Sequence, residues 1–275
     1  MNHELADFLR RARSARDPVA AGLPADGRVR RVPGLRREEV ALLAGVSADY
    51  YARLEQGRRI VPSPAVVDGI ARALALEPAG RAHLERLIAQ PARRGRRSAP
   101  VQRVRPGLRQ LLDSLVGQPA LVLGRRTDVL ACNRMAAALL TDFDRLPPRQ
   151  RNYARWMFGS AEARELLVDW EVQARAVVEN LRLDDPDDAA SADLIAELTA
   201  ASPEFARWWE EHRVHQRTFG TKHFRHPVVG DLSVAYETFT LPGDADQTLF
   251  VYSTEPGSPS SEAMALLASW VEVRG

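Results

Sequence analysis

Four histidines in the second half of the chain have spacings that could bind a metal ion. His212 and His215 form one HxxH pair, and His223 and His226 form another. Imidazole nitrogens are common zinc ligands, but the first pair is predicted to end a helix and the second to end a strand, so the sequence does not assure their convergence. No cysteine is close, and the flanking cations would repel a metal ion: Arg213, Arg217, Lys222 and Arg225. We therefore expect no metal ion and no other cofactor.

Motifs of catalysis are also missing from the sequence. There is no Walker loop, no GxGxxG, no GxSxG, and no Ser/His/Asp set tied by a motif. The single cysteine, Cys132, excludes an internal disulfide framework and fits a reducing cytoplasm. No apolar run approaches the roughly 20 residues that cross a bilayer. These observations predict a cytoplasmic protein that is neither an enzyme nor a membrane protein.

The charges of the chain are segregated along its length. Residues 1–107 contain 21 Arg and 11 acidic residues, a net charge of +10, whereas residues 108–275 contain 17 basic and 25 acidic residues, a net charge of −8. Of the 38 basic residues, 37 are Arg and only Lys222 is Lys. Such asymmetry indicates that the first part binds a polyanion and that the second part has another task.

The strongest local pattern is the stretch Val40–Gly57. Gly45 follows a predicted helix and can adopt the positive φ of a sharp turn, and Ser47 is a good N-cap for the next helix. Ala41 and Tyr51 have the sizes that packing of the two helices requires. The pattern predicts a helix-turn-helix, which places its second helix in the major groove of double-stranded DNA. The alternative is a tight helical hairpin without that role.

Two sets of side chains follow from this motif. Residues at the start or on the outer face of the second helix are expected to contact base edges: Ser47, Ala48, Asp49, Tyr50 and Arg53. Arg53 is the strongest candidate and is expected to pair with guanine. Ser47 has the alternative role of a plain cap, and Tyr50 that of packing on its neighbours. Arginines that flank the groove are expected to contact phosphates: Arg36, Arg37, Arg58 and Arg59.

The elements around these residues define two domains and a linker. Residues 1–90 are predicted to form an all-α domain with helices at Glu4–Arg16, Arg36–Ala44, Ser47–Gln56, Ser63–Leu76 and Pro78–Gln90. Residues 91–107 contain six Arg and three Pro without any acidic residue, which is typical of a linker.

Residues 108–275 are predicted to form an α+β domain with an antiparallel sheet of about five strands. The strands are expected at Ala120–Leu123, Asp128–Cys132, Thr218–Arg225, Leu232–Leu241 and Thr248–Thr254. Helices are predicted at Leu108–Val116 and Asn133–Leu140, across most of 148–213, and at Ser258–Val271.

The whole chain resembles one family of regulators. Residues 1–90 are similar to helix-turn-helix domains of the phage-repressor-like (XRE/Cro type) transcription regulators, and the string PGLRREEVALLAGVSADYYARLEQGR resembles the MmyB-like regulators of actinomycetes. The strings ALVLGRRTDVLACN, SPEFARWWEEH, GTKHFRHPVVG and YSTEPGSPS in the second half also resemble that family. The resemblance implies a PAS-like ligand-binding domain in residues 108–275. It also implies an ion pair between Arg13 and Glu55 that supports the first domain.

The resemblance further implies a small hydrophobic ligand, with a fatty acid as the favoured class. A carboxylate needs a cluster of buried donors, and the candidates are Asn133, Arg151, Asn152, His226 and Tyr236. Each has an ordinary alternative: Asn133 as a helix cap, Arg151 as a surface residue, and His226 as the partner of a buried carbonyl.

The sequence as a whole predicts a homodimeric, sequence-specific DNA-binding regulator whose second domain senses a small molecule. Two other classes remain open. The second domain could be an interaction module without a pocket, or an enzyme controlled by its own DNA-binding domain.

Overall fold

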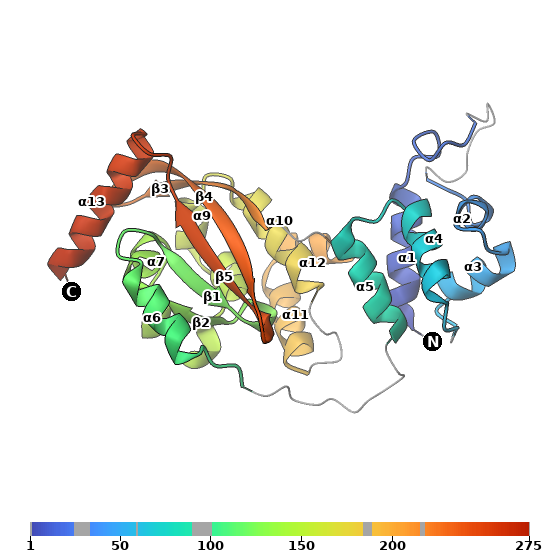
Figure 1. Cartoon of the computed structure of the whole chain (residues 1–275), viewed down its shortest axis with the longest axis horizontal. Coiled ribbons are helices and arrows are strands. Elements are labelled where there is room, and N and C mark those ends of the chain that lie inside the picture. Colours follow the sequence, from blue (N-terminus) through green and yellow to red (C-terminus); the bar gives the residue numbers. More distant parts are fainter. Residues whose placement is uncertain are drawn as a thin grey trace. The chain divides into compact units, whose positions relative to one another are not determined.

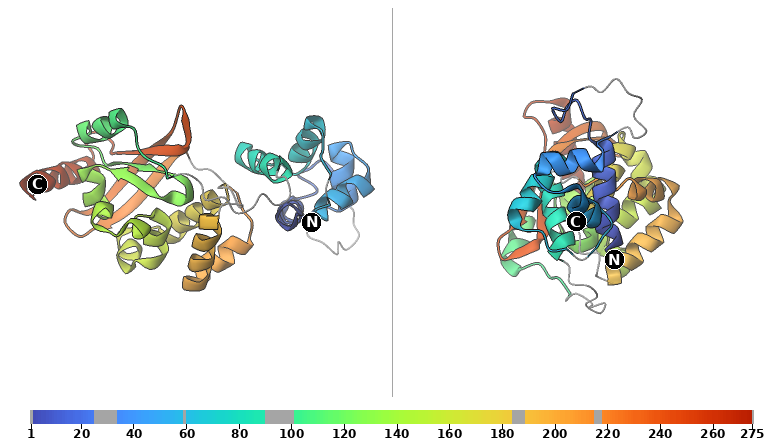
Figure 2. Two further views of the ribbon diagram at one scale, coloured as in Figure 1. Left: turned by 90° about the horizontal axis from the view of Figure 1, so that it is seen from below. Right: turned by 90° about the vertical axis from the view of Figure 1, so that its right-hand side faces the viewer.

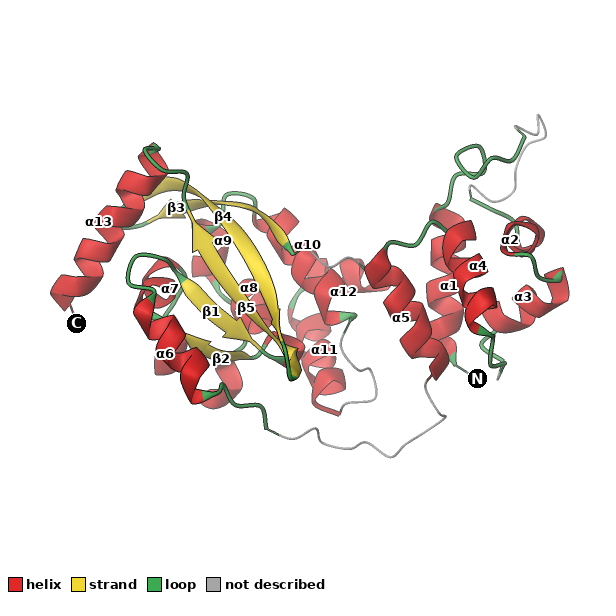
Figure 3. Cartoon of the chain, in the orientation of Figure 1, coloured by secondary structure: helices red, strands yellow, loops and turns green. Residues whose placement is uncertain are grey.

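The computed structural model describes residues 2–24, 34–58, 60–89, 101–183, 189–214 and 218–274. The chain divides into two compact units: Met1–Arg96 with Glu210–His215, and Arg97–Trp209 with Gln216–Gly275. Helices form the first unit, and the sheet belongs to the second (Figure 1, Figure 3). The expected division near residue 100 therefore omits the short segment 210–215, which no shift in composition distinguishes from the helix before it.

In the described residues, the first unit has five helices around one apolar core. They are α1 (His3–Ala15), α2 (Arg37–Ala44), α3 (Ala48–Glu55), α4 (Pro64–Ala73) and α5 (Pro78–Ala89). Their core includes the fully buried side chains of Leu9, Leu54 and Ile70. The five predicted helices are confirmed, with ends that differ by a few residues.

The turn between α2 and α3 has the geometry that its residues predict. Gly45 ends α2 with φ of 70°, in the left-handed region that favours glycine. The Ser47 hydroxyl then caps α3 by accepting a hydrogen bond from the Tyr50 amide at 3.1 Å. A Cβ atom at Gly69 would lie 2.5 Å from the carbonyl oxygen of Ala44, so glycine allows the close approach of α4 to α2.

The second unit combines one sheet with eight helices in the part of the chain that the structure describes. The helices are α6 (Pro106–Ser114), α7 (Arg134–Leu139), α8 (Tyr153–Gly159), α9 (Ala161–Leu166), α10 (Trp170–Leu181), α11 (Ala189–Ala201), α12 (Pro203–Glu210) and α13 (Pro259–Arg274). The strands are β1 (Ala120–Leu123), β2 (Val129–Cys132), β3 (Phe219–His226), β4 (Gly230–Leu241) and β5 (Asp244–Ser253). They form a fully antiparallel sheet in the order β2-β1-β5-β4-β3.

Each face of this sheet contacts a different set of helices. In β1, Ala120 and Val122 pack with α6 on one face, whereas Leu121 and Leu123 belong to the larger core on the other face. That larger core is completed by α7 to α13, and the left view of Figure 2 shows α6 on the opposite side of the sheet from α8 to α10. The alternation follows from the two-residue period of a strand.

The predicted order of the elements is confirmed in this unit. All five expected strands are present, and α7 begins after Asn133 as the pattern predicts. The helical stretch 148–213 is divided into several helices, with ends at Gly159 and a start at Pro203. The linker prediction for 91–107 lies largely outside the described residues, and its last two residues begin α6.

Candidate functional site

The exposed face of α3 carries the residues that were expected to read bases. Ser47, Ala48, Asp49 and Arg53 are exposed and Tyr50 is half-buried, whereas Tyr51 and Leu54 point into the core. An Arg53 Nη1 atom lies 3.9 Å from an Asp49 carboxylate oxygen, one helical turn away. An exposed pair at that distance is weak, so the Arg53 guanidinium is free to exchange this partner for a base edge.

The expected phosphate contacts lie at the two ends of the motif. Arg36 and Arg58 are exposed in the loops before α2 and after α3, and Arg59 lies outside the described residues. Arg37 is different, because its Nε donates to Glu55 at 2.8 Å while about half of its side chain stays exposed. Arg37 therefore supports the fold of the motif in addition to any contact with phosphate.

Glu55 is the centre of a buried ionic network. Arg13 donates two hydrogen bonds to its carboxylate, at 2.7 and 3.1 Å, so the expected Arg13–Glu55 pair is confirmed. Arg13 also donates to the carbonyl of Leu35 at 2.8 Å, which ties the start of the motif to α1. Burial alone would raise the pKa of Glu55, but the hydrogen bonds from Arg13 and Arg37 outweigh it and hold this pKa below its usual range.

A cavity of about 100 Å³ lies in the second unit between the sheet and α10. Its apolar lining includes Leu121, Leu123, Val177 and Phe250. Polar side chains from α8, α10, β3, β4 and β5 also line it, among them Tyr153, Gln173, Lys222, Tyr236 and Tyr252. An apolar cavity with a few convergent polar groups is typical of a small-molecule site.

Lys222, the only lysine of the chain, lies in the wall of this cavity. Lys222 is buried, with only 6% of its surface exposed. Its Nζ donates hydrogen bonds to the hydroxyls of Tyr153 at 3.1 Å and Tyr252 at 3.3 Å, and lies 5.2 Å from the centre of the Tyr236 ring. Within the described residues, no carboxylate forms an ion pair with it. A buried ammonium without a counter-charge is unfavourable, so this end of the cavity favours an anion.

The phenols beside Lys222 add further donors. Burial raises the pKa of Tyr252 to about 12 despite the neighbouring Lys222, and burial also raises the pKa of Tyr153. Both hydroxyls are therefore protonated at neutral pH. Each accepts from Lys222 and keeps its own proton, so the ammonium and two phenols can donate together to one carboxylate.

Two of the predicted ligand residues have structural partners instead. The Asn133 amide accepts hydrogen bonds from the amides of Ala120 and Ala136 and donates to the carbonyls of Leu115 and Gln118. The Asn152 amide donates to the carbonyl of Arg126 at 2.7 Å and to Asp128 at 2.9 Å, and accepts from the Arg155 amide. Both amides are buried, and neither lines the cavity.

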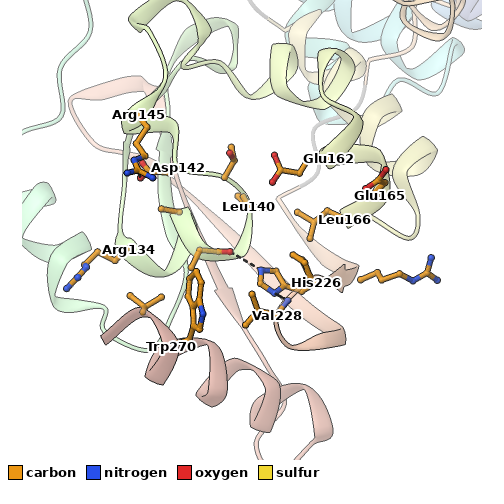
Figure 4. A pocket seen from close by; sticks show the side chains of 16 residues that line it. Arg134, Leu140, Asp142, Arg145, Glu162, Glu165, Leu166, His226, Val228 and Trp270 are labelled. Atoms are coloured by element: carbon orange, nitrogen blue, oxygen red, sulfur yellow. Dashed lines mark hydrogen bonds and ion pairs between the residues drawn. The ribbon is translucent and has the colours of Figure 1, made fainter. Parts of the chain in front are cut away.

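Arg151 and His226 also lie away from the cavity. Arg151 donates to the carbonyls of Leu146 at 2.9 Å and Asp144 at 2.8 Å. His226 faces an open groove of about 970 Å³ beside α7 and α13, where its Nε2 is 2.9 Å from the carbonyl oxygen of Ala138 (Figure 4). Of the five predicted residues, only Tyr236 lines the cavity, so the structure does not bring the set together.

The geometry of β3 keeps the histidines of the second HxxH pair apart. His223 and His226 are an odd number of residues apart on β3, so they point to opposite faces of the strand. The His223 Nδ1 lies 2.8 Å from the Ser233 hydroxyl. No group of three or more His, Cys, Asp or Glu side chains suited to a metal ion occurs among the described residues, and His215 lies outside them.

Lys222 was missed as a site residue, although the sequence contains two signals for it. It is the only lysine among 37 arginines, and strand alternation places it on the same face as Phe224 and His226, which are buried. A charged residue at an inward position of a strand is informative because it must find a partner.

Comparison with known proteins supports the two-part organisation. The family model of the MmyB-like transcription regulator ligand binding domain matches residues 104–267, and a helix-turn-helix domain model matches residues 4–84. The first match covers more than half of the chain. The chain belongs to the MmyB-like transcription regulators. No curated protein matches it.

The two matches fix the general role of this MmyB-like regulator. The helix-turn-helix match contains α2 and α3, and the ligand-binding match contains the whole lining of the Lys222 cavity. The chain is a DNA-binding transcription regulator with a ligand-binding domain. Within the described residues, no helix has the length and apolar character needed to cross a membrane.

Proposed function

We propose that this MmyB-like regulator reads a specific DNA operator with α3 and adjusts that binding to a small hydrophobic carboxylate held beside Lys222. A fatty acid is the favoured ligand class. The observation that carries the ligand half of the proposal is the buried ammonium of Lys222, which has no carboxylate partner among the described residues. We place the regulator in the cytoplasm, where its DNA is.

The DNA half of the proposal rests on the exposed side chains of α3. Arg53 is assigned to guanine, and Asp49, Tyr50, Ala48 and Ser47 to neighbouring base edges and methyl groups. Arg36, Arg37 and Arg58, with Arg59 beyond the described residues, are assigned to phosphates. The net charge of +10 in residues 1–107 supports this assignment, because phosphate neutralisation supplies most of the non-specific affinity for DNA.

A homodimer is the proposed binding form. Helix-turn-helix proteins of the XRE/Cro type usually gain affinity by placing two reading helices in successive major grooves. We therefore expect a two-fold symmetric operator whose half-site centres are about one helical turn, roughly 34–36 Å, apart. Selection of binding sites from random DNA, followed by footprinting, tests the symmetry. A protein–DNA mass that corresponds to one chain per operator would contradict the dimer.

The ligand half of the proposal differs from the set Asn133, Arg151, Asn152, His226 and Tyr236. Tyr236 keeps its place, and Lys222, Tyr153 and Tyr252 replace the other members as donors to the carboxylate. Leu121, Val177 and Phe250 would contact the apolar chain of the ligand. The presence of a cavity in this unit favours a sensor over an interaction module without a pocket.

Operator binding with and without ligand tests the complete proposal. The operator is the DNA selected above, and the ligands are sodium salts of saturated fatty acids from four to ten carbons. We expect at least one of them to change the dissociation constant of the operator complex. Identical operator affinity across the whole series, together with no binding of any acid by calorimetry, would remove the sensor proposal.

A further inference from the structure

The turn between β1 and β2 is strained, and it forms part of the cavity wall. Arg126 and Thr127 both have φ of 58°. This left-handed region is uncommon for residues other than glycine and is unfavourable for a β-branched residue such as Thr127. Gly124 and Thr127 both line the Lys222 cavity. Strained backbone that persists beside a binding site points to a role in the response to the ligand.

Contacts from α8 hold the turn in this conformation. The Asn152 amide donates to the carbonyl of Arg126 at 2.7 Å, and the Thr127 hydroxyl accepts from the Ala154 amide at 3.1 Å. These contacts lie beside Tyr153, which is the first residue of α8 and a hydrogen-bond partner of Lys222. The turn and the proposed carboxylate site therefore share the start of α8.

The outer side of the same turn holds the segment that enters the second unit. The Gln102 side chain accepts a hydrogen bond from the Arg125 amide at 2.8 Å, and its amide group lies 3.3 Å from the carbonyl oxygen of Asp246. A Cβ atom at Gly124 would lie 2.5 Å from the Gln102 Oε1 atom, so a larger residue at this position would require the Gln102 side chain to move. Gln102 thus contacts the β1–β2 turn at Arg125, whereas Gly124 and Thr127 of the same turn line the cavity.

Two further contacts extend this attachment. The Gln247 amide donates to the carbonyl of Arg103 at 3.2 Å, and Gln247 precedes the cavity residue Thr248. Arg105 forms an ion pair of 3.2 Å with Asp244. Residues 101–105 are therefore attached to the β1–β2 turn and to β5 through side chains next to the cavity lining, directly after the Arg-rich stretch that follows α5.

The cavity beside this turn is small for a ligand-binding pocket. Its volume of about 100 Å³ is smaller than the roughly 300–1,000 Å³ of typical ligand pockets. A long-chain carboxylate such as decanoate must therefore displace part of the wall. The strands are paired by ladders of hydrogen bonds on both sides of β1, β5 and β4, whereas the β1–β2 turn is strained, so we take the turn as the wall segment that moves.

We propose that residues 101–105 form a ligand-sensitive clamp: a carboxylate ligand in the Lys222 cavity displaces the turn Gly124–Thr127 and releases Gln102. This inference rests on the proposed function and assigns its route of regulation. The released segment leads to the DNA-binding unit, so the clamp state alters the freedom of the chain between the two units. Gln102 is a positioning residue, because it does not line the cavity.

Amide hydrogen exchange of the full-length protein tests the clamp directly. The Arg125 N–H donates to Gln102, so its exchange rate measures whether the clamp is closed. The probe is sodium decanoate, with binding followed independently by calorimetry. We expect saturating decanoate to accelerate exchange in residues 124–128 by about fivefold or more, because loss of a hydrogen bond opens the amide to water.

A pair of glutamine variants separates the clamp from the pocket. Gln102→Ala should bind decanoate at least as tightly as the parent, because no hydrogen bond to Gln102 has to be broken; it should also show fast Arg125 exchange without ligand and lose the effect of decanoate on operator affinity. Gln110→Ala is the matched control, because Gln110 is exposed on α6 and has no partner among the described contacts. It should behave like the parent protein.

The outcomes that overturn the clamp differ from those that overturn the sensor. If decanoate binds but exchange at Arg125 is unchanged or slower, the clamp is wrong and the pocket stands. If Gln102→Ala keeps the full effect of decanoate on operator affinity, the clamp is also wrong. If neither decanoate nor any other acid of the series binds the parent protein, the ligand site and the clamp both fail.

Discussion

At the scale of single residues, the proposed ligand site depends on Lys222. We predict that Lys222→Met weakens decanoate binding by about 10-fold or more, because a charge-assisted hydrogen bond contributes about 1.5–3 kcal/mol. Loss of the buried ammonium should leave the melting temperature unchanged or higher, since replacing a buried ion by an apolar side chain of similar volume is often neutral or stabilising. Calorimetry and thermal melting of the full chain measure both effects.

Arg225→Met is the matched control for Lys222→Met. Arg225 lies on the same strand but is largely exposed, and its distance of 3.7 Å to Asp231 is that of a weak surface pair. The two variants remove one positive charge each from β3. Equal decanoate affinity in both would show that Lys222 is not the carboxylate partner.

Glu55 is the residue whose ionisation should control the acid stability of the first unit. Its folded-state pKa lies below its usual range, so the stabilisation is present above the unfolded-state pKa of about 4.3 and is lost as the pH falls further. We predict that Glu55→Gln lowers the free energy of unfolding by about 3 kcal/mol or more at pH 7. Urea unfolding between pH 3 and pH 7 should show this difference shrinking toward the acid end.

Glu85→Gln provides the comparison for Glu55→Gln. Glu85 pairs with Arg81 at 3.0 Å, but both side chains are half exposed. Its replacement should change the free energy of unfolding by less than about 1 kcal/mol. If Glu55→Gln lowers the free energy of unfolding no more than Glu85→Gln does, or by an amount that is independent of pH, the role of the buried network is contradicted.

The sequence allowed some of these residues to be predicted and not others. Arg53 and Glu55 belong to a short motif whose spacing determines which side chains face out, so local pattern was sufficient. The proposed carboxylate site joins Tyr153 on α8 to Lys222 on β3 and Tyr252 on β5, and no local pattern shows that these segments meet. Asn133 and Asn152 were expected to bind the ligand, but the Asn133 amide binds backbone groups and the Asn152 amide binds backbone groups and the Asp128 carboxylate.

At the scale of elements, Asn133 connects three parts of the second unit. Its side chain binds the end of α6, the start of β1 and the first turn of α7. We predict that Asn133→Ala destabilises the protein by about 3 kcal/mol, since loss of a cap costs about 1 kcal/mol and the freed buried groups add to it. Decanoate affinity should be retained under conditions where the variant is folded.

Ser160→Ala tests the same kind of cap without the other connections. Ser160 caps α9 by accepting from the Ala163 amide at 3.4 Å. We expect a loss of about 1 kcal/mol or less in the free energy of unfolding. If chemical denaturation shows that Asn133→Ala lowers the free energy of unfolding no more than Ser160→Ala does, then the additional hydrogen bonds of Asn133 contribute little.

The α3 helix carries the specificity of the proposed operator complex. Arg53→Ala should weaken binding to the selected operator by about 1–3 kcal/mol and leave binding to random DNA nearly unchanged, because a guanine contact discriminates between bases. Arg72→Ala, an exposed arginine on α4, is the control. Competition assays at a fixed salt concentration compare the variants. An equal loss on operator and random DNA would assign Arg53 to phosphate instead.

Elements were predicted more accurately than the contacts between them. Caps and turns are local, so Ser47, Gly45 and Pro203 mark element ends where the sequence places them. The sheet order β2-β1-β5-β4-β3 depends on pairing of β1 with β5, which are distant in sequence. Such pairing follows from burial of both faces and not from any local signal, so the strands were predicted but their order in the sheet was not.

At the scale of the whole molecule, the charge asymmetry separates two tasks in one chain. The net charge of +10 belongs to the residues that contain the helix-turn-helix, and the net charge of −8 belongs to those that contain the cavity. A negatively charged ligand-binding unit avoids DNA. The chain passes between the two units before residue 101 and again on either side of residues 210–215, and residues 101–105 are the connection to which we assign a role in the effect on the operator.

Coupling between the two units has to be reciprocal if the regulator is a sensor. When decanoate changes the operator dissociation constant by some factor, saturating operator must change the decanoate dissociation constant by the same factor, typically about 5- to 150-fold. We predict equal factors from fluorescence titrations of the full-length protein in both directions. The Lys222→Met variant should show neither effect at decanoate concentrations that saturate the parent but not the variant: decanoate should not change its operator affinity, and operator should not change its decanoate affinity. Unequal factors would show that decanoate acts on DNA binding through a second site or through aggregation, and not through the Lys222 cavity.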